Sequence, residues 1–314
     1  MKILVTGAGG FLGSHFVDRL VAENHEVLAL DPAGKKKFIT NQARVYKLSC
    51  KSPSLNKIFE KEKPDMVCHF GTDDTVLTSF DHPLKNAEHI QNTLNLLELC
   101  KHHKVKRIIY PSSAATYGNP QYLPCDEQHP CHPVSPLGVT QRAIENYLYF
   151  YWVNFNLDHI ILRIANAYGP RQSGERDGGI ISILIRQMLR SEQVIINGDG
   201  FQERDFIYSS DVMDGIMAAV NYSARTGKRV PPAHFIFNLG TSRSYSINHL
   251  FGKLKEHIIY NRKPVKGPQL PCEVFEMSLD PAHAITKLNW SPKVNLDDGI
   301  NRTLRWFKKE LKIK

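Results

Sequence analysis

Short apolar runs alternate with longer amphipathic stretches through the first half of the chain. Continuous apolar runs predict strands at residues 3–5, 26–30, 45–48, 66–70, 107–110 and 159–163. Apolar residues at helical spacing predict helices over residues 11–23, 84–103 and 136–154. Strands without polar alternation are buried on both faces, which is typical of a parallel sheet covered by helices. The pattern therefore predicts an α/β fold with a doubly wound, Rossmann-type parallel sheet.

The rhythm of the sequence changes after Asn166. Glycine and proline gather at residues 168–170 and 174–179, and helices are predicted over residues 180–190 and near residues 298–309. We therefore expect a first domain over residues 1–165 and a smaller C-terminal lobe over residues 166–314, with a boundary that is discontinuous in sequence. The absence of a flexible linker predicts a rigid interface with a cleft between the two.

The composition is that of an ordinary folded protein. Of the 314 residues, 42% are hydrophobic and 23% are charged, which excludes disordered, collagen-like and coiled-coil chains. No apolar run reaches the roughly 18 residues of a membrane-spanning helix. The N-terminus enters a strand at once and lacks the pattern of a signal peptide. We therefore expect a cytoplasmic protein.

The net charge of +9 comes from 40 basic and 31 acidic residues. Apart from Lys35-Lys36-Lys37 and the C-terminal end, the basic residues are scattered, and no basic run is interleaved with aromatic residues. This distribution favours solvated surfaces that attract anionic small molecules, rather than a nucleic-acid or membrane partner. The six cysteines contain no CxxC pair, so we expect free thiols, with no disulfide framework and no metal site.

A glycine-rich segment, residues 6–13 (TGAGGFLG), joins the first predicted strand to the first predicted helix. Gly10 lets a pyrophosphate approach the backbone and Gly13 lets the helix pack on the strand, so that phosphates meet the helix N-terminus. Asp31 ends the next strand, where an acid binds the adenosine ribose and repels a 2′-phosphate. The segment predicts a site for NAD rather than NADP, a preference that Lys35 to Lys37 can blunt. The alternative is a glycine turn without a ligand.

Several motifs together resemble the extended short-chain dehydrogenases, in the branch of NAD-dependent nucleotide-sugar epimerases and dehydratases. Besides the glycine segment, they lie at residues 104–118, 162–172, 198–212, 237–240 and 287–292. The resemblance covers nearly the whole chain. It implies a domain that holds NAD, a lobe that holds a nucleoside-diphosphate sugar, and redox chemistry on the hexose. It also implies a YxxxK motif, whose tyrosine removes a hydroxyl proton and whose lysine holds the nicotinamide ribose.

The resemblance assigns individual residues to each ligand. The residues assigned to NAD are Gly7, Gly10, Phe11, Leu12, Gly13, Asp31, Cys50, Phe70, Gly71, Thr72, His89 and Ser112. The residues assigned to the sugar nucleotide are Asn166, Arg171 and Arg204. A guanidinium suits the diphosphate, although Arg204 has a structural alternative in an ion pair with Asp205 or Asp211. Ser113 is assigned to hold the reacting hydroxyl.

Four positions depart from the pattern of that family. Leu137 stands at the position of the tyrosine and Gln141 at that of the lysine. Leucine has no proton to exchange, and uncharged glutamine cannot lower the pKa of a neighbour. His89 replaces an asparagine, and Cys50 lies where an aspartate meets adenine. The loss of a positioned acid–base group typically costs about 10²–10⁴ in rate, so epimerase activity does not follow from the resemblance alone.

Other residues are candidates to replace the missing tyrosine. Tyr117 is close to Ser113 in sequence, but we expect a structural role for it. His89 either faces the nicotinamide or is a satisfied helix histidine. Asp73 and Asp74 follow the fourth strand, at the edge where ligands bind in this fold, and either provide a base or shape the loop.

Two functions remain open from the sequence. The first is an epimerase-like enzyme of nucleotide sugars with NAD and rearranged acid–base residues. The second is a catalytically impaired homologue that binds NAD or a sugar nucleotide as a partner or regulatory subunit. The residues after Pro136 are apolar around most of the predicted helix, and residues 94–100 are similar. The resemblance implies that these two helices pair as a four-helix bundle, so we expect a homodimer.

Overall fold

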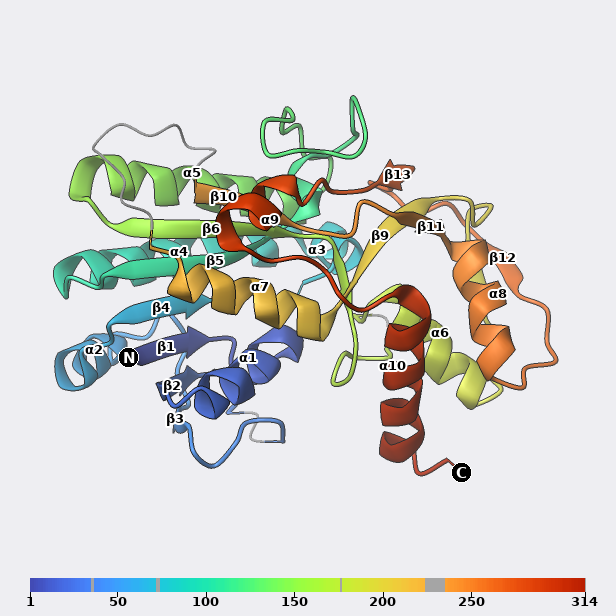
Figure 1. Ribbon diagram of the computed structural model, residues 1–314, viewed down its shortest axis with the longest axis horizontal. Helices are drawn as coiled ribbons and strands as arrows, with labels where there is room; N and C mark the ends of the chain where they lie inside the picture. Colours follow the sequence, from blue (N-terminus) through green and yellow to red (C-terminus); the bar gives the residue numbers. More distant parts are fainter. Residues whose placement is uncertain (35–36, 72–73, 176, 224–234, 314) are drawn as a thin grey trace.

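The computed structural model describes residues 1–34, 37–71, 74–175, 177–223 and 235–313. Its main sheet confirms the predicted fold class. In spatial order, the strands are β10 (Ile236–Leu239), β6 (Asp158–Ile164), β5 (Arg107–Ser113), β4 (Met66–His69), β1 (Lys2–Thr6), β2 (Glu26–Leu30) and β3 (Arg44–Tyr46). All six neighbouring pairs are parallel, so the carboxyl ends of the strands share one edge (Figure 1).

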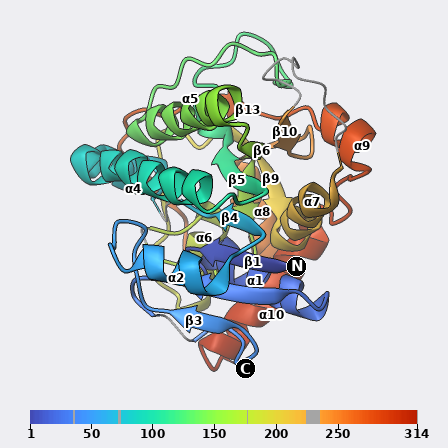
Figure 2. The ribbon, with the colours of Figure 1, turned by 90° about the vertical axis from the view of Figure 1, so that its left-hand side faces the viewer.

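Helices cover both faces of this sheet, and Figure 2 shows the sheet between the two layers of helices. One face packs on α2 (Leu55–Glu62), α4 (Pro83–His102) and α5 (Pro136–Phe155). The other face packs on α1 (Phe11–Ala22), α7 (Ser209–Asn221) and α9 (Ala282–Leu288). Neighbouring strand residues alternate between the two cores: Leu4 and Leu28 face the first set of helices, whereas Ile3 and Val27 face the second.

The C-terminal lobe contains shorter strands and a core of its own. Its four-stranded mixed sheet consists of β7 (Asn166–Tyr168), β9 (Glu203–Tyr208), β11 (Ser244–Ser246) and β13 (Glu276–Met277), and β8 (Ile195–Asn197) pairs with β12 (Val265–Gly267). The helices of the lobe are α6 (Ile180–Leu189), α8 (Ile247–His257) and α10 (Leu296–Glu310). Three elements that come late in the sequence belong to the first part: β10 is a strand of the main sheet, and α7 and α9 pack on it. The chain therefore crosses between the two parts more than once.

Several boundaries differ from the sequence predictions. The third strand is Arg44–Tyr46 rather than residues 45–48, and the fifth extends to Ser113. α2 and α3 (Val76–Asp81) were not predicted, and neither was the 3₁₀ turn η1 (Ala114–Thr116). α3 has only six residues and begins at a capping box formed by Thr75 and Thr78. Such a helix is too short for hydrophobic periodicity to reveal it.

A buried ion pair joins α5 to the sheet. Arg163 on β6 donates to Glu145 on α5, from Nε to Oε1 at 3.1 Å and from Nη2 to Oε2 at 2.7 Å. Ser112 at the end of β5 donates to Glu145 Oε1 at 2.7 Å. Both charged side chains are 1% exposed. The glutamate therefore fixes α5, which carries Leu137 and Gln141, against two central strands.

We predict that Glu145→Gln lowers the free energy of unfolding by about 3–5 kcal/mol, because it leaves the Arg163 guanidinium buried without a counter-charge. Urea unfolding followed by circular dichroism measures this change. The matched control is Glu88→Gln, which breaks an exposed pair between Glu88 and Lys51. The control is expected to cost less than about 1 kcal/mol. Equal losses in the two variants would contradict the assigned role of Glu145.

Candidate functional site

The glycine segment forms a cradle between β1 and α1. Gly7 has a φ of +61°, and a Cβ built on it would lie 2.6 Å from the carbonyl oxygen of Phe70. A Cβ on Gly13 would lie 2.1 Å from the carbonyl oxygen of Gly7. Since real side chains do not approach backbone atoms this closely, both positions require glycine. The structure therefore gives a physical reason for two of the four glycines assigned to the cofactor, Gly7 and Gly13.

The first turn of α1 offers the backbone donors that an anion needs. Its N-cap is Gly10, which supplies no side-chain cap, and no acidic residue lies in the first turn. The N–H groups of this turn, which includes Phe11 and Leu12, have no intrahelical acceptor and carry the positive end of the helix dipole. Beside them, the buried Asp31 carboxylate accepts a hydrogen bond from the Gly9 N–H at 3.0 Å. This donor set fits a dinucleotide whose pyrophosphate lies at the helix start.

Most of the remaining cofactor candidates lie at or just beyond the ends of β3, β4 and β5, and His89 lies on α4. Phe70 packs its ring against Phe16 of α1, with ring centroids 5.7 Å apart, and Gly71 follows it. The Cys50 thiol is a neutral contact, because burial raises its pKa to about 12. Ser112 directs its hydroxyl to Glu145, as described above. Thr72 and the neighbouring Asp73 lie outside the described residues.

The side chains of Leu137 and Gln141 both lie in the protein interior. Leu137 is 7% exposed, and its backbone N–H donates to Ser79 Oγ on α3 at 3.1 Å. Gln141 is also buried and accepts a hydrogen bond at Oε1 from the phenol of Tyr110 on β5. An aliphatic group and an amide with an internal partner have no proton to exchange with a ligand. Neither side chain can therefore serve as a general acid or base.

Ser113 and Tyr117 lie at either end of the 3₁₀ turn η1. Ser113 Oγ caps this turn by accepting from the Ala115 N–H at 3.1 Å. Tyr117 is fully buried and donates to Asn238 Oδ1 at 2.7 Å. Burial raises the pKa of Tyr117 well above its ordinary value, which disfavours the phenolate that a base requires. These contacts agree with the structural role expected for Tyr117.

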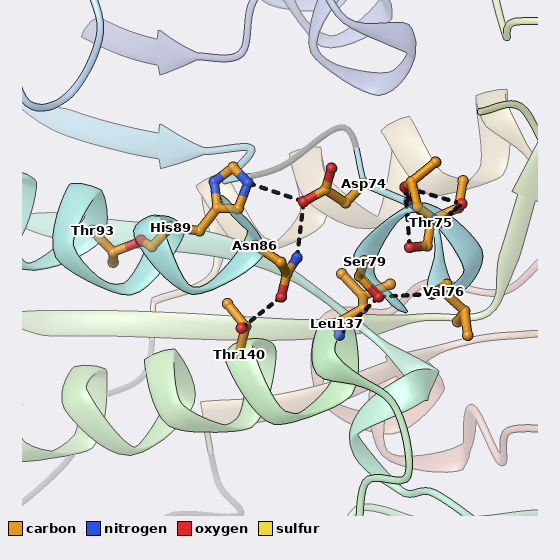
Figure 3. A network of polar contacts seen from close by, with 10 residues as sticks. Asp74, Thr75, Val76, Ser79, Asn86, His89, Thr93, Leu137 and Thr140 are labelled. Carbon is orange, nitrogen blue, oxygen red and sulfur yellow. Dashed lines mark hydrogen bonds and ion pairs between the residues drawn. The ribbon is translucent and has the colours of Figure 1, made fainter. Parts of the chain in front are cut away.

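A connected polar network lies between α3, α4 and α5 (Figure 3). The Asp74 carboxylate oxygen Oδ2 accepts from Asn86 Nδ2 at 2.9 Å and lies 3.2 Å from His89 Nε2. Asn86 Oδ1 accepts from Thr140 Oγ1 at 2.7 Å. Sequence reasoning did not single out Asn86 or Thr140. The available signal was the spacing of Asn86 and His89, three residues apart and therefore on one face of α4.

The basic residues assigned to the sugar nucleotide lie in different surroundings. Arg204 on β9 is largely buried, donates to the carbonyl oxygens of Glu203 at 2.7 Å and Phe275 at 3.3 Å, and lies 3.9 Å from a carboxylate oxygen of Glu273. The alternative ion pair with Asp205 or Asp211 is not among its described contacts. Burial lowers the pKa of the Arg204 guanidinium.

Asn166 and Arg171 differ in how far they are already engaged. Asn166 begins β7 and is exposed, so its amide remains accessible to a ligand. Arg171 instead forms an ion pair with Asp18 of α1, with 2.5 Å between Nη2 and Oδ2. The structure thus directs Arg171 to the first domain, and its charge is already paired there.

The described residues also bear on the expectations for disulfides, metal sites and membrane-spanning helices. All six cysteines are free thiols. In the described part of the chain, no group of histidine, cysteine, aspartate and glutamate has the arrangement of a metal site. The same part of the chain contains no helix with the length and apolarity to span a membrane.

Comparisons with known proteins agree on one family. The sequence model of the NAD dependent epimerase/dehydratase family matches residues 3–240. The chain is 34% identical over 310 residues to a putative UDP-glucose 4-epimerase of Methanocaldococcus jannaschii, covering 98% of each protein. It is similar, with a TM-score of 0.93 and 34% identity, to a Thermotoga maritima UDP-glucose 4-epimerase solved with UDP-glucose, covering 99% of this chain and 100% of that one. It is also similar to a Thermus thermophilus UDP-glucose 4-epimerase solved with NAD, with a TM-score of 0.89 and 28% identity. That similarity covers 98% of this chain and 99% of the other.

Two buried histidines predict a loss of stability in mild acid. Burial lowers the pKa of His69 to about 3 and that of His159 to about 4. Below a pH of about 6.5, these two histidines therefore bind protons in the unfolded chain but stay neutral in the folded chain. We expect the free energy of unfolding to fall by about 1.4 kcal/mol per pH unit for each histidine, from about pH 6 to about pH 4.

Urea unfolding of His69→Gln at several pH values measures the contribution of His69. The variant is expected to lose one histidine's share of this slope. His102→Gln, at the exposed end of α4, is the control and should keep the wild-type slope. An unchanged slope in His69→Gln would show that His69 accepts a proton in the folded state.

Proposed function

Because the chain belongs to the NAD dependent epimerase/dehydratase family, we propose that it binds NAD and a UDP-sugar and catalyses epimerisation of the sugar by reversible oxidation. The observation that carries the proposal is the glycine cradle at the start of α1, with Asp31 beside it. Similarity over nearly the full length to UDP-glucose 4-epimerases supports the choice of a UDP-hexose as the substrate class.

The proposed binding mode follows from the fold and the donor set. The first turn of α1 holds the pyrophosphate of the dinucleotide, and Asp31 holds the adenosine ribose, which favours NAD over NADP. NAD supplies an acceptor for a hydride when it is bound. Arg204 and Asn166 hold the diphosphate side of the sugar nucleotide, and Ser113 donates its hydroxyl to the reacting oxygen.

The proposed active site lacks the usual acid–base residues of the family. We propose that Leu137 and Gln141 occupy the places of its tyrosine and lysine. The side chain of Leu137 contributes shape alone, and the amide of Gln141 is held by Tyr110. Neither can receive the hydroxyl proton, so the proposed oxidation needs a base from elsewhere in the site.

A second function is favoured by the same two positions. A homologue that binds NAD or a sugar nucleotide without turning the sugar over would keep the cradle or Arg204 but not YxxxK. The internal hydrogen bond of Gln141 and the burial of Leu137 agree with such a binding or regulatory subunit. Turnover of UDP-glucose to an epimer distinguishes the two functions.

We expect mass spectrometry under denaturing conditions to detect NAD released from freshly purified protein. Isothermal titration with UDP-glucose is expected to show binding that Arg204→Gln weakens by about 10- to 100-fold, because a charge-assisted contact with a phosphate is worth about 1.5–3 kcal/mol. The control, Arg243→Gln, removes an exposed arginine of the same lobe and should leave the affinity unchanged.

Each result bears on a separate part of the proposal. Released NAD with no affinity for UDP-glucose would contradict the proposed substrate. Bound UDP-glucose without NAD, together with no affinity for added NAD, would contradict the redox function and leave the regulatory one.

We also propose that the protein is a homodimer joined through α4 and α5. The outer face of α5 exposes Tyr147, Phe150 and Val153, which are 39%, 47% and 55% exposed. A groove of about 360 Å³ lies on this face, lined by Ala143, Asn146, Tyr147 and Phe150. Adjacent apolar side chains of this size favour burial against a second copy of the same helix pair.

Light scattering coupled to gel filtration is expected to give twice the chain mass at micromolar concentration. Phe150→Glu should yield a monomer, because it would bury a carboxylate in an apolar interface. Ile259→Glu alters an apolar residue that is 92% exposed just beyond α8, and should leave the dimer intact. A monomeric wild-type protein would refute this assembly.

A further inference from the structure

The Asp74–His89 pair has the arrangement of an oriented base. Because the carboxylate of Asp74 can only accept a hydrogen bond, Nε2 carries a proton, and in the neutral imidazole Nδ1 then has the lone pair. Nδ1 is buried and has no hydrogen-bond partner among the described residues. A carboxylate that fixes the tautomer of a histidine, with the second nitrogen unprotonated, is the arrangement used in general base catalysis.

The position of the pair in the fold is that of a nicotinamide site. β4 lies between β1, which leads into the glycine cradle, and β5, which ends at Ser113. A dinucleotide that starts at α1 and reaches Ser113 must pass the carboxyl end of β4. Asp74 follows that strand end, and its hydrogen bond to Asn86 connects it through Thr140 to α5 (Figure 3).

Leu137 lies next to the helix that Asp74 leads into. Its backbone N–H donates to Ser79 of α3, and α3 begins two residues after Asp74. Thr140, one turn further along α5, contacts Asn86, which also holds Asp74. The pair thus adjoins the segment of α5 where the family's tyrosine would stand.

The contacts of two other titratable groups near this edge, His69 and Tyr117, exclude them as the general base. His69, the buried neighbour that His89 faces from β4, uses both ring nitrogens: Nδ1 lies 2.7 Å from Thr6 Oγ1 and Nε2 lies 3.0 Å from Thr93 Oγ1. Tyr117 is buried with its hydroxyl on Asn238. Among these groups, His89 alone combines an orienting carboxylate with a nitrogen that makes no hydrogen bond.

We propose that Asp74 and His89 act together as the proton acceptor and donor of the redox step, in place of the absent tyrosine. The inference rests on the proposed function. The hydroxyl O–H bond of the sugar breaks and its proton passes to the Asp74–His89 pair. The carbon that bears this hydroxyl would lose a hydride, for which NAD⁺ held by the glycine cradle and Asp31 would be the acceptor, and would become a carbonyl. Return of the hydride to the opposite face and of the proton to the oxygen completes the epimerisation.

The decisive experiment compares single variants in two backgrounds. In the wild-type background, Asp74→Asn and His89→Asn should each lower kcat for UDP-glucose by about 10²–10⁴-fold with little change in KM, as expected for loss of a general base. Glu88→Gln, on the exposed face of α4, is the control and should keep the wild-type rate. In the Leu137→Tyr/Gln141→Lys background, which supplies a phenol and an ammonium, His89→Asn should have little effect.

The outcomes separate this inference from the proposed function. Full activity of both single variants would overturn the role of the pair while epimerase activity stands. An inactive wild type with an active Leu137→Tyr/Gln141→Lys variant would also overturn it, because the binding and redox sites would then be intact without a working base. If both backgrounds are inactive despite bound NAD and UDP-glucose, the proposed function fails and the inference fails with it.

A second measurement does not depend on activity. Long-range ¹H–¹⁵N spectra of protein labelled at histidine report which ring nitrogen is protonated, and the signal missing from His89→Asn identifies His89. We expect Nε2 to carry the proton at slightly alkaline pH, with Asp74→Asn weakening this preference. A proton on Nδ1 in the wild-type protein would show that Asp74 does not orient the ring as a base, and would overturn the inference.

Discussion

The close approach of α1 to the end of β1 is the constraint on which the site depends. Gly13 permits it, because any side chain there would overlap the Gly7 carbonyl, and Gly7 in turn lies against Phe70 after β4. The contact points the first turn of α1 at the edge where the parallel strands end. The other proposed ligand-binding groups, from Asp31 to Ser113, are placed by the same sheet relative to that turn.

A second constraint acts through α5, which is anchored by polar contacts in addition to its apolar packing on the sheet. The Glu145–Arg163 pair holds the middle of the helix to β6, and the hydrogen bond of Gln141 to Tyr110 holds the preceding turn to β5. In this arrangement the side chain of Gln141 makes its hydrogen bond inside the protein. Its polar group meets the need of a buried phenol for an acceptor, which otherwise would cost stability. Gln141 therefore has a structural role that does not depend on catalysis.

The sequence predicted the sheet, its main helices and the glycine cradle because each rests on local patterns. Apolar runs specify strands such as β1, and the spacing of glycines specifies the turn before α1. The network of Asp74, Asn86 and Thr140 could not be predicted in the same way. It forms between segments that meet only when α4 packs on α5, and each member alone has an ordinary role in a loop, a helix or a cap. For the same reason, the pairing of Arg171 with Asp18 became apparent only in three dimensions.

Conversion of a tyrosine-dependent site to another base requires more than a new titratable residue. The new group must be oriented, and the lost phenol must not leave a buried void or an unpaired donor. In the proposed site, Leu137 would fill the place of that phenol with apolar volume, and its N–H donates to Ser79 Oγ. Asp74 orients His89 and is itself held by Asn86, whose carbonyl is engaged by Thr140 on the same helix as Leu137. These contacts connect Leu137 and His89 through neighbouring helices. The effects of substitutions at Leu137 and at His89 on kcat are therefore expected to be coupled rather than additive.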